Sequence, residues 1–271
     1  MQTPIALACQ EHGSGPPVLI LHGLFGSAQN WTTVARRWAA RFHVFALDLR
    51  NHGASPWADS MSYPEMAQDV AGFIAARGLG SAAIVGHSMG GKVAMALALA
   101  ATEIVERLVV VDIAPVAHAP AHQDEIAAMQ ALDLARIDRR GAADAALKPS
   151  IPDDAVRAFL VQNLVAGPAG LRWRINLDVI AAEIAALSGF PDFPAGTAYP
   201  GPTLAVRGGR SPYVRDRDLA AFARIFPALR LVTIADAGHW LHAERMDEFL
   251  AAVTPFLDGA GDVSGGPGSH L

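Results

Sequence analysis

The sequence predicts an α/β fold in which a mostly parallel central sheet is flanked by helices. Short, almost continuously apolar runs alternate with amphipathic stretches of helical length along most of the chain. Strands covered on both faces have this apolar pattern, and their alternation with helices is typical of parallel sheets. One long interval in the middle of the chain lacks such runs, which predicts an insertion between two strands of the sheet.

The strands and helices of the predicted sheet follow each other regularly along the chain. The N-terminal run "IALACQEHGSG" suits an antiparallel edge strand or a hairpin. Strands are predicted at 17–22, 43–49, 82–87, 107–112, 203–208 and 230–236. Helices are predicted at about 31–40, 64–77, 89–101, 216–226 and 242–257, because apolar residues recur there at helical spacing.

The interval 115–202 is predicted to be a helical cap. Its recognisable segments, 124–135, 153–165 and 171–187, have helical patterns only, and long insertions in compact domains tend to be functional. The chain is thus expected to consist of a core domain (1–114 and 203–257) and a cap that acts as a lid. The Gly/Ser-rich tail, 258–271, is predicted to be disordered.

Composition excludes several classes of function. The net charge of −5 and the pI near 6.0 give no basic surface for nucleic acid. No run of about 18 apolar residues is available to span a bilayer, so no membrane span is expected. The single cysteine, Cys9, excludes an internal disulfide and a thiolate cluster, and a reducing cytoplasm is the default compartment. No His, Asp or Glu cluster has metal-ligand spacing, so neither a metal nor a cofactor is expected.

The stretch "GHSMGG" (86–91) predicts a catalytic serine. It joins a predicted strand to a predicted helix, the position at which a Gly-x-Ser-x-Gly turn exposes its serine. Gly86 and Gly90 are needed because side chains there would collide with neighbouring backbone. Ser88 would lie at a helix N-terminus, which favours a developing negative charge. The competing interpretation is a serine that only caps the helix.

Other groups that acyl chemistry needs are found in two further turns. The backbone amides of Met89 and of Leu24, in "HGLFGS" (22–27), are candidates for the oxyanion hole. His239, in "DAGHWLHAE" (236–244), follows the last predicted strand and is the candidate base. His242 is expected to point elsewhere, and His22 is expected to be a buried, structural hydrogen-bonding residue.

The order of these motifs resembles that of the α/β-hydrolase superfamily over residues 15–257. More narrowly, "HGLFGS", "DLRNHGAS" (48–55), "VVVDIAP" (109–115), "WRINLD" (173–178) and "GGRSPYV" (208–214) are similar to the YbfF-type esterase branch. The resemblance implies a serine esterase or thioesterase acting on acyl esters. It also implies that Asp48 and Arg50 brace the loop after their strand.

The acid that orients the histidine is the least obvious member of the predicted site. The superfamily usually carries Asp or Glu in the turn after the strand at 203–208, but this chain has Ser211 there. Asp112, at the end of the preceding strand, is the candidate acid, and the resembling branch suggests this use. Ser211 would then be a helper that hydrogen-bonds to Asp112 or His239. Alternatively, Asp112 caps the next turn.

Three more carboxylates are weighed for the same role. Asp216 and Asp218 suit the acidic first turn of a helix better. Asp178, on a cap helix, would have to reach down to the histidine from the lid.

The sequence is therefore interpreted as a serine hydrolase that cleaves carboxylic esters or thioesters through an acyl-enzyme intermediate. Its partner would be a small-molecule acyl ester or thioester, and Phe25 and Trp31 are expected to help make the acyl pocket apolar. A cofactor-free haloperoxidase or perhydrolase and a carbon–carbon bond hydrolase would keep the same triad. A ligand-binding receptor on a hydrolase scaffold is a further alternative, from a different class of function.

Overall fold

A computed structural model describes residues 4–119, 121–168 and 170–259. Seven strands form one sheet in the order β1-β3-β2-β4-β5-β8-β9. β1 pairs antiparallel with β3 at one edge, and the other pairs in this sheet are parallel. The prediction of a mostly parallel sheet is therefore confirmed. The strands are β1 (Cys9–His12), β2 (Pro17–Leu21), β3 (His43–Leu47), β4 (Ala82–His87), β5 (Val105–Val111), β8 (Thr203–Gly208) and β9 (Leu229–Ile234).

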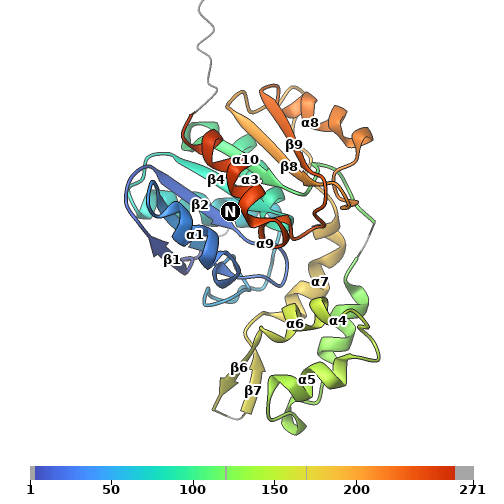
Figure 1. Cartoon of the computed structure of the whole chain (residues 1–271). Helices are drawn as coiled ribbons and strands as arrows, with labels where there is room; N and C mark the ends of the chain where they lie inside the picture. Colours follow the sequence, from blue (N-terminus) through green and yellow to red (C-terminus); the bar gives the residue numbers. More distant parts are fainter. Residues whose placement is uncertain (1–3, 120, 169, 260–271) are drawn as a thin grey trace, which may run out of the picture.

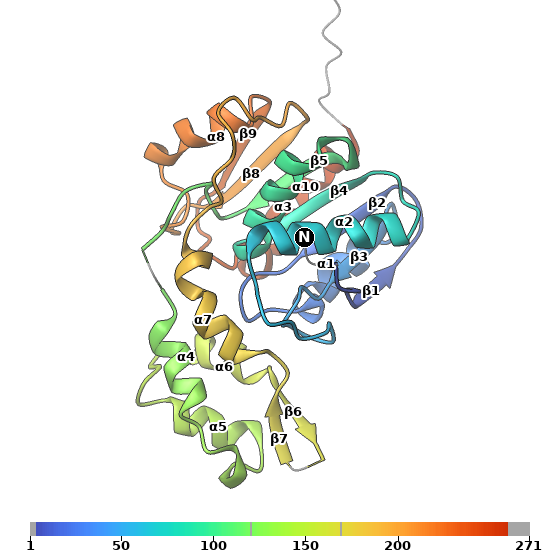
Figure 2. The ribbon, with the colours of Figure 1, turned by 180° about the vertical axis from the view of Figure 1, so that it is seen from behind.

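Helices cover both faces of this sheet (Figures 1 and 2). α1 (Thr32–Trp38) and α10 (Met246–Leu257) pack on one face, where they share an apolar core with the strands. α2 (Tyr63–Ala76), α3 (Met89–Ala100) and α8 (Leu219–Ile225) contribute to the core on the other face. Successive strand residues supply the two cores in turn, since strand side chains alternate between faces: Leu19 lies in one core and Ile20 in the other.

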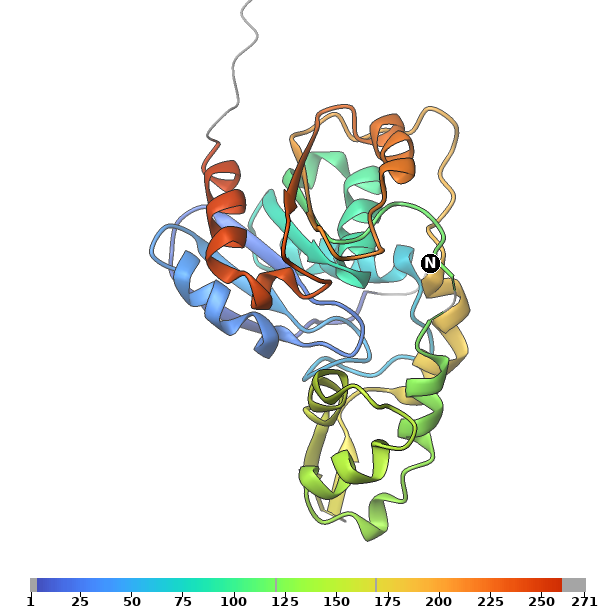
Figure 3. The ribbon, with the colours of Figure 1, turned by 45° about the vertical axis from the view of Figure 1, so that its right-hand side comes forward.

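Residues 115–202 are named here the inserted segment, and the helices of this segment lie to one side of the sheet (Figure 3). The segment contains α4 (Gln123–Gln130), α5 (Arg140–Leu147), α6 (Asp154–Val161) and α7 (Leu177–Ser188). The remaining helices are short. They are the 3-10 helices η1 (Ala28–Trp31), η2 (Thr102–Ile104), η3 (Leu134–Arg136) and η4 (Asp216–Asp218), and the single α-helical turn α9 (Leu241–Glu244).

The expectation that the inserted segment holds only helices is wrong over residues 164–173. An antiparallel hairpin lies there, with β6 (Leu164–Gly167) paired to β7 (Gly170–Trp173). α6 ends at Val161, and Gly167 and Pro168 oppose the start of another helix after it, because glycine and proline both disfavour a helix interior. Leu164 is fully buried and opposes Trp173, so the hairpin packs one end against the rest of the segment.

The boundaries of the parallel strands and of α1, α2 and α3 agree with the sequence to within two residues, whereas the helix predicted at 124–135 ends at Gln130 and α5 was not predicted. The helix predicted at 242–257 is divided at Arg245 into α9 and α10. Among the described residues, no helix has the length and apolar character needed to cross a bilayer. The predicted disordered tail lies outside the described residues from position 260 onward.

Candidate active site

Ser88 lies in a strained turn between β4 and α3. Its φ of 53° is in the left-handed region, which costs a non-glycine residue about 1–2 kcal/mol. The close packing predicted around this turn is present. A Cβ atom on Gly86 would lie 2.2 Å from the carbonyl oxygen of Gly90, and one on Gly90 would lie 2.4 Å from that of Leu21. The turn therefore depends on both glycines, and it exposes Ser88 at the first turn of α3.

Asp112 and His239 meet at the carboxyl ends of the strands. His239 Nδ1 donates to Asp112 Oδ2 over 2.7 Å, and the Asp112 side chain is fully buried. The other carboxylate oxygen, Oδ1, accepts the backbone N–H of Gly208 at 2.9 Å. Ser211 also donates its hydroxyl hydrogen to Asp112 Oδ2. The structure thus brings the candidate acid, base and helper residue together, with the helper bonded to the acid.

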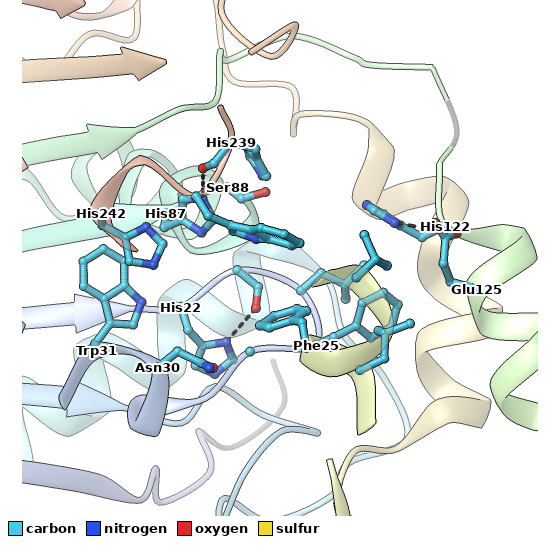
Figure 4. Close-up of a pocket in the computed structure, with 17 residues that line it drawn as sticks. His22, Phe25, Asn30, Trp31, His87, Ser88, His122, Glu125, His239 and His242 are labelled. Atoms are coloured by element: carbon cyan, nitrogen blue, oxygen red, sulfur yellow. Dashed lines mark hydrogen bonds and ion pairs between the residues drawn. The ribbon is translucent and has the colours of Figure 1, made fainter. Parts of the chain in front are cut away.

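Ser88 and His239 line the same cleft and lie next to each other in Figure 4. His239 is held through both its backbone and its ring. The backbone carbonyl of His239 accepts a hydrogen bond from Nε2 of His87 at 2.9 Å, and the centroid of the Tyr213 ring lies 4.2 Å from that of the His239 ring. With Nδ1 used by Asp112, Nε2 of His239 is the nitrogen available to Ser88.

The two candidate oxyanion amides are both available. Leu24 and Met89 donate no backbone hydrogen bond to any residue that the structure describes. Leu24 belongs to the turn 23–26, closed by a hydrogen bond of 2.9 Å from Gly26 N–H to the Gly23 carbonyl. Met89 is the first residue of α3, so its amide is one of the unpaired donors at a helix start.

Buried neutral histidines surround these groups. Burial lowers the pKa of His22 to about 4 and the pKa values of His52 and His242 to about 3. Burial also lowers the pKa of His87 well below its usual range. His22 accepts from Leu49 N–H at Nε2 and donates to the Gly23 carbonyl from Nδ1, which is the structural role expected for it.

Two clefts adjoin Ser88. The first measures about 680 Å³ with the space open to solvent included, and aromatic rings of Phe25, Trp31, Phe159 and Trp240 line it. His239 and His242 also line this cleft, and Trp31 stacks on His242 with 4.1 Å between ring centroids.

The second cleft measures about 490 Å³ on the same basis. It shares Leu24, Ser88 and His122 with the first cleft, whereas Ile184 and Lys92 line only the second. Lys92 is buried, and its ammonium donates to the carbonyls of Ser188 and Gly189 at the end of α7. Burial lowers the pKa of Lys92 to about 8.

The other carboxylates considered for the acid lie elsewhere. Asp178 is exposed and accepts from Gln130 at 3.2 Å. Asp216 pairs with Arg207, and Asp218 accepts the backbone N–H of Arg215 at the start of η4. Of the carboxylates weighed from the sequence, Asp112 is the one that contacts His239.

Asp48 and Arg50 hold the loop after β3, as expected. Asp48 accepts the backbone N–H groups of Ala28 and Ala54 at 2.7 and 2.8 Å. Arg50 is buried and forms a bidentate pair with Asp69 at 2.7 and 2.9 Å. Within the described residues, no group of His, Cys, Asp and Glu is arranged to hold a metal ion.

The comparison with known protein families agrees with this geometry. Residues 16–245 match the family model described as the alpha/beta hydrolase fold. The chain belongs to the α/β-hydrolase family. The matched range runs from the start of β2 to the end of α9 and includes Ser88, Asp112 and His239.

Similar proteins narrow the class of this α/β-hydrolase. It is 40% identical over 254 residues to the sn-1-specific diacylglycerol lipase ABHD11 of Xenopus laevis, covering 91% of this chain and 81% of that protein. It is 36% identical to the esterase YbfF of Escherichia coli, covering 93% and 97% of the two chains. A solved marine microorganism esterase superposes with a TM-score of 0.89 at 38% identity, covering 93% and 99%. The chain is accordingly a serine ester hydrolase.

Sequence reasoning did not single out two residues that contact the turn 23–26, which carries the candidate Leu24 amide. His52 lies in the quoted motif "DLRNHGAS", yet nothing in that motif shows that its Nε2 accepts the N–H of Phe25 at 3.2 Å. Asn163 follows α6 and donates from Nδ2 to the Phe25 carbonyl at 2.8 Å. Its contact spans 138 positions of the chain, so no local pattern could have indicated it.

Proposed function

We propose that Ser88, His239 and Asp112 hydrolyse an acyl ester through an acyl-enzyme intermediate. Nε2 of His239 takes the hydroxyl proton as Ser88 Oγ bonds to the ester carbonyl carbon. The carbonyl π-electron pair moves to oxygen, and the amides of Leu24 and Met89 stabilise that oxyanion. When the carbonyl reforms, the bond to the alcohol oxygen breaks, and His239 donates its proton to that oxygen.

Deacylation repeats these steps with water as the nucleophile. His239 accepts a proton from water as its oxygen bonds to the acyl carbon, and then returns the proton to Ser88 Oγ, releasing the acid. Asp112 keeps the imidazole proton on Nδ1 throughout and stabilises the imidazolium between the two steps. The hydrogen bond of 2.7 Å between His239 and the buried Asp112 carboxylate is the observation that carries this proposal.

The two clefts suggest how an ester lies across Ser88. The departing alcohol must be within reach of His239, which lines the first, aromatic cleft but not the second. The alcohol side would therefore occupy the first cleft, with Phe25 and Trp31, and the acyl side the second, with Ile184 and Met89. This assignment places the two aromatic residues beside the alcohol rather than beside the acyl chain, where the sequence analysis expected them.

The inserted segment would act as a cap that selects the substrate. Val156, Phe159 and Leu160 of α6 line the first cleft, while Ile184 and Leu187 of α7 line the second. Both sides of the ester would thus contact the segment. Thioesters fit the same chemistry, since the triad does not require oxygen in the leaving group. The location we propose is the cytoplasm, since a chain with a single cysteine needs no oxidising compartment.

A panel of p-nitrophenyl esters from C2 to C16, assayed beside acyl-CoA thioesters, tests this function. We expect turnover of the activated esters, with a preference for short acyl chains because the second cleft is the smaller one. Failure to hydrolyse any ester or thioester would contradict the proposal. Peroxide-dependent turnover in place of hydrolysis would indicate a perhydrolase instead.

A further inference from the structure

The oxyanion turn contains a second strained residue. Phe25, at the third position of the turn 23–26, has a φ of 61°, which an aromatic residue rarely adopts. Such conformations cost about 1–3 kcal/mol and persist only where the surroundings hold them. The contacts that hold Phe25 therefore also affect the Leu24 amide, which lies directly before it.

Both backbone polar groups of Phe25 are held by buried side chains. Its N–H donates to Nε2 of His52. Nδ1 of His52 donates to the Arg50 carbonyl at 3.0 Å, which leaves Nε2 as the acceptor. Its carbonyl accepts from Nδ2 of Asn163 at 2.8 Å. His52 belongs to the core of the fold, whereas Asn163 comes from the inserted segment.

The orientation of the Asn163 amide is fixed by its neighbours. Oδ1 of Asn163 accepts from Nε of Arg174 at 3.4 Å, and a guanidinium can only donate. Nδ2 faces the carbonyls of Phe25 and Leu160, which can only accept. The backbone of Asn163 is bonded as well, since its carbonyl accepts the N–H of Arg174 at 2.9 Å. The side chain is 1% exposed, so water does not compete for these bonds.

A chain of two rigid peptide planes joins Asn163 to the oxyanion amide. The Phe25 carbonyl and the Gly26 N–H belong to one planar peptide, so Asn163 orients both. Gly26 N–H donates to the Gly23 carbonyl at 2.9 Å. The Gly23 carbonyl in turn shares a peptide plane with the Leu24 N–H, which points the opposite way. The direction of the Leu24 amide therefore depends on the bond from Asn163.

We propose that Asn163 is a positioning residue that aims the Leu24 amide at the oxyanion. The inference rests on the proposed function, in which that amide stabilises the tetrahedral intermediate. It makes the inserted segment part of the catalytic apparatus as well as part of the substrate cleft. Loss of the bond would let the strained turn relax and would weaken stabilisation of the transition state more than binding of the ester.

Asn163→Ala and Asn163→Asp test this role, with Gln162→Ala as the matched control. The aspartate keeps the shape and can still accept from Arg174, but it cannot donate to the Phe25 carbonyl. Gln162 is exposed and accepts from Asn30 at 3.1 Å, so it also joins the inserted segment to the core, but its bond is to Asn30 and not to the turn 23–26. Removal of a whole oxyanion donor typically costs about 10²–10³ in kcat, so a misaimed one should cost about 10- to 100-fold.

The measurements separate positioning from a merely structural role. For both Asn163 variants we expect kcat on a p-nitrophenyl ester to fall by about 10- to 100-fold while KM stays near the wild-type value. The Ki of a trifluoromethyl ketone, which forms an oxyanion adduct with Ser88, should rise by the same factor, and binding of the corresponding alcohol should not change. Gln162→Ala should behave as wild type in all three measurements.

An unchanged Ki for the ketone in Asn163→Asp, even with a lowered melting temperature, would overturn the proposal. Asn163 would then only hold the inserted segment in place. If Asn163→Ala does not fold, the isosteric Asn163→Asp decides the question. Covalent modification of Ser88 in the wild-type protein tests the proposed function separately, so the two failures are distinguishable.

Discussion

Replacement of Asp112 by asparagine should disable His239 without removing it from the site. The structure fixes how the new amide would lie. Gly208 N–H donates to the Oδ1 position at 2.9 Å, so the oxygen of the introduced amide must stay there and its NH₂ group must occupy the Oδ2 position. That NH₂ would donate to Nδ1 of His239, which would leave the imidazole proton on Nε2, facing Ser88. This tautomer cannot accept the serine proton.

The expected loss is large. A wrong histidine tautomer together with the missing counter-charge costs on the order of 10³–10⁴ in kcat in serine triads. Ser211→Ala removes only a neutral donor to the same carboxylate and should cost about tenfold. Asp178→Asn, on the exposed face of α7, should leave kcat unchanged.

Steady-state hydrolysis of one p-nitrophenyl ester by the three variants provides the assay. Circular dichroism and thermal unfolding check that each variant is folded. The rank order Asp112→Asn, Ser211→Ala, Asp178→Asn is expected, from the largest loss to none. If Asp112→Asn stayed within tenfold of wild type while Asp178→Asn were nearly inactive, the acid would lie in the inserted segment and our assignment would be wrong.

The serine turn, a buried histidine and the two clefts each predict the effect of a substitution. Gly86→Ala should prevent native folding, because its Cβ would lie 2.2 Å from a backbone oxygen. Gly141→Ala is the control: no atom lies within 4 Å of its Cβ position, so it should be neutral or stabilising, and expression and melting temperature compare the two variants. Burial lowers the pKa of His242 to about 3 in the folded protein, whereas in the unfolded chain this histidine takes up a proton below pH 6.5. The free energy of unfolding should therefore fall as the pH falls, by up to about 1.4 kcal/mol per pH unit. His242→Phe should therefore show a shallower loss between pH 6 and 4.5 in urea unfolding, and an equal slope would refute this. Leu160→Trp should reduce turnover of esters with bulky alcohols, and Ile184→Trp should reduce turnover of esters with long acyl chains. The reverse result would mean that the alcohol lies in the second cleft and the acyl chain in the first.

Most strands and helices of the fold can be predicted from local sequence patterns. Apolar runs such as 17–22 and 82–87 predict buried strands because their residues are covered on both faces, and the structure places β2 and β4 there. The hairpin at 164–173 gives no comparable local signal, since its short strands contain leucines at spacings that a helix also allows. Pairing across a sheet, which decides such cases, is not a local property.

Some residues of the candidate site can be predicted from local sequence, and others depend on contacts between distant segments. Ser88 and His239 lie in turns whose glycines are adjacent in sequence, so both were predictable. Asp112 needed the resemblance to a family as well, because its contact with His239 spans 127 positions. Asn163 could not be predicted, since a polar residue after an amphipathic helix has the same pattern whether it faces solvent or the oxyanion turn. Its role depends on burial, which only the tertiary structure supplies.

Covalent labelling of Ser88 tests the central claim most directly. A fluorophosphonate should add one phosphonyl group to the wild-type protein, and peptide mapping by mass spectrometry should locate it on Ser88. Ser88→Ala should remain unlabelled and lose ester hydrolysis by roughly six orders of magnitude in kcat. Equal labelling of the variant, or hydrolysis that survives the substitution, would contradict the account.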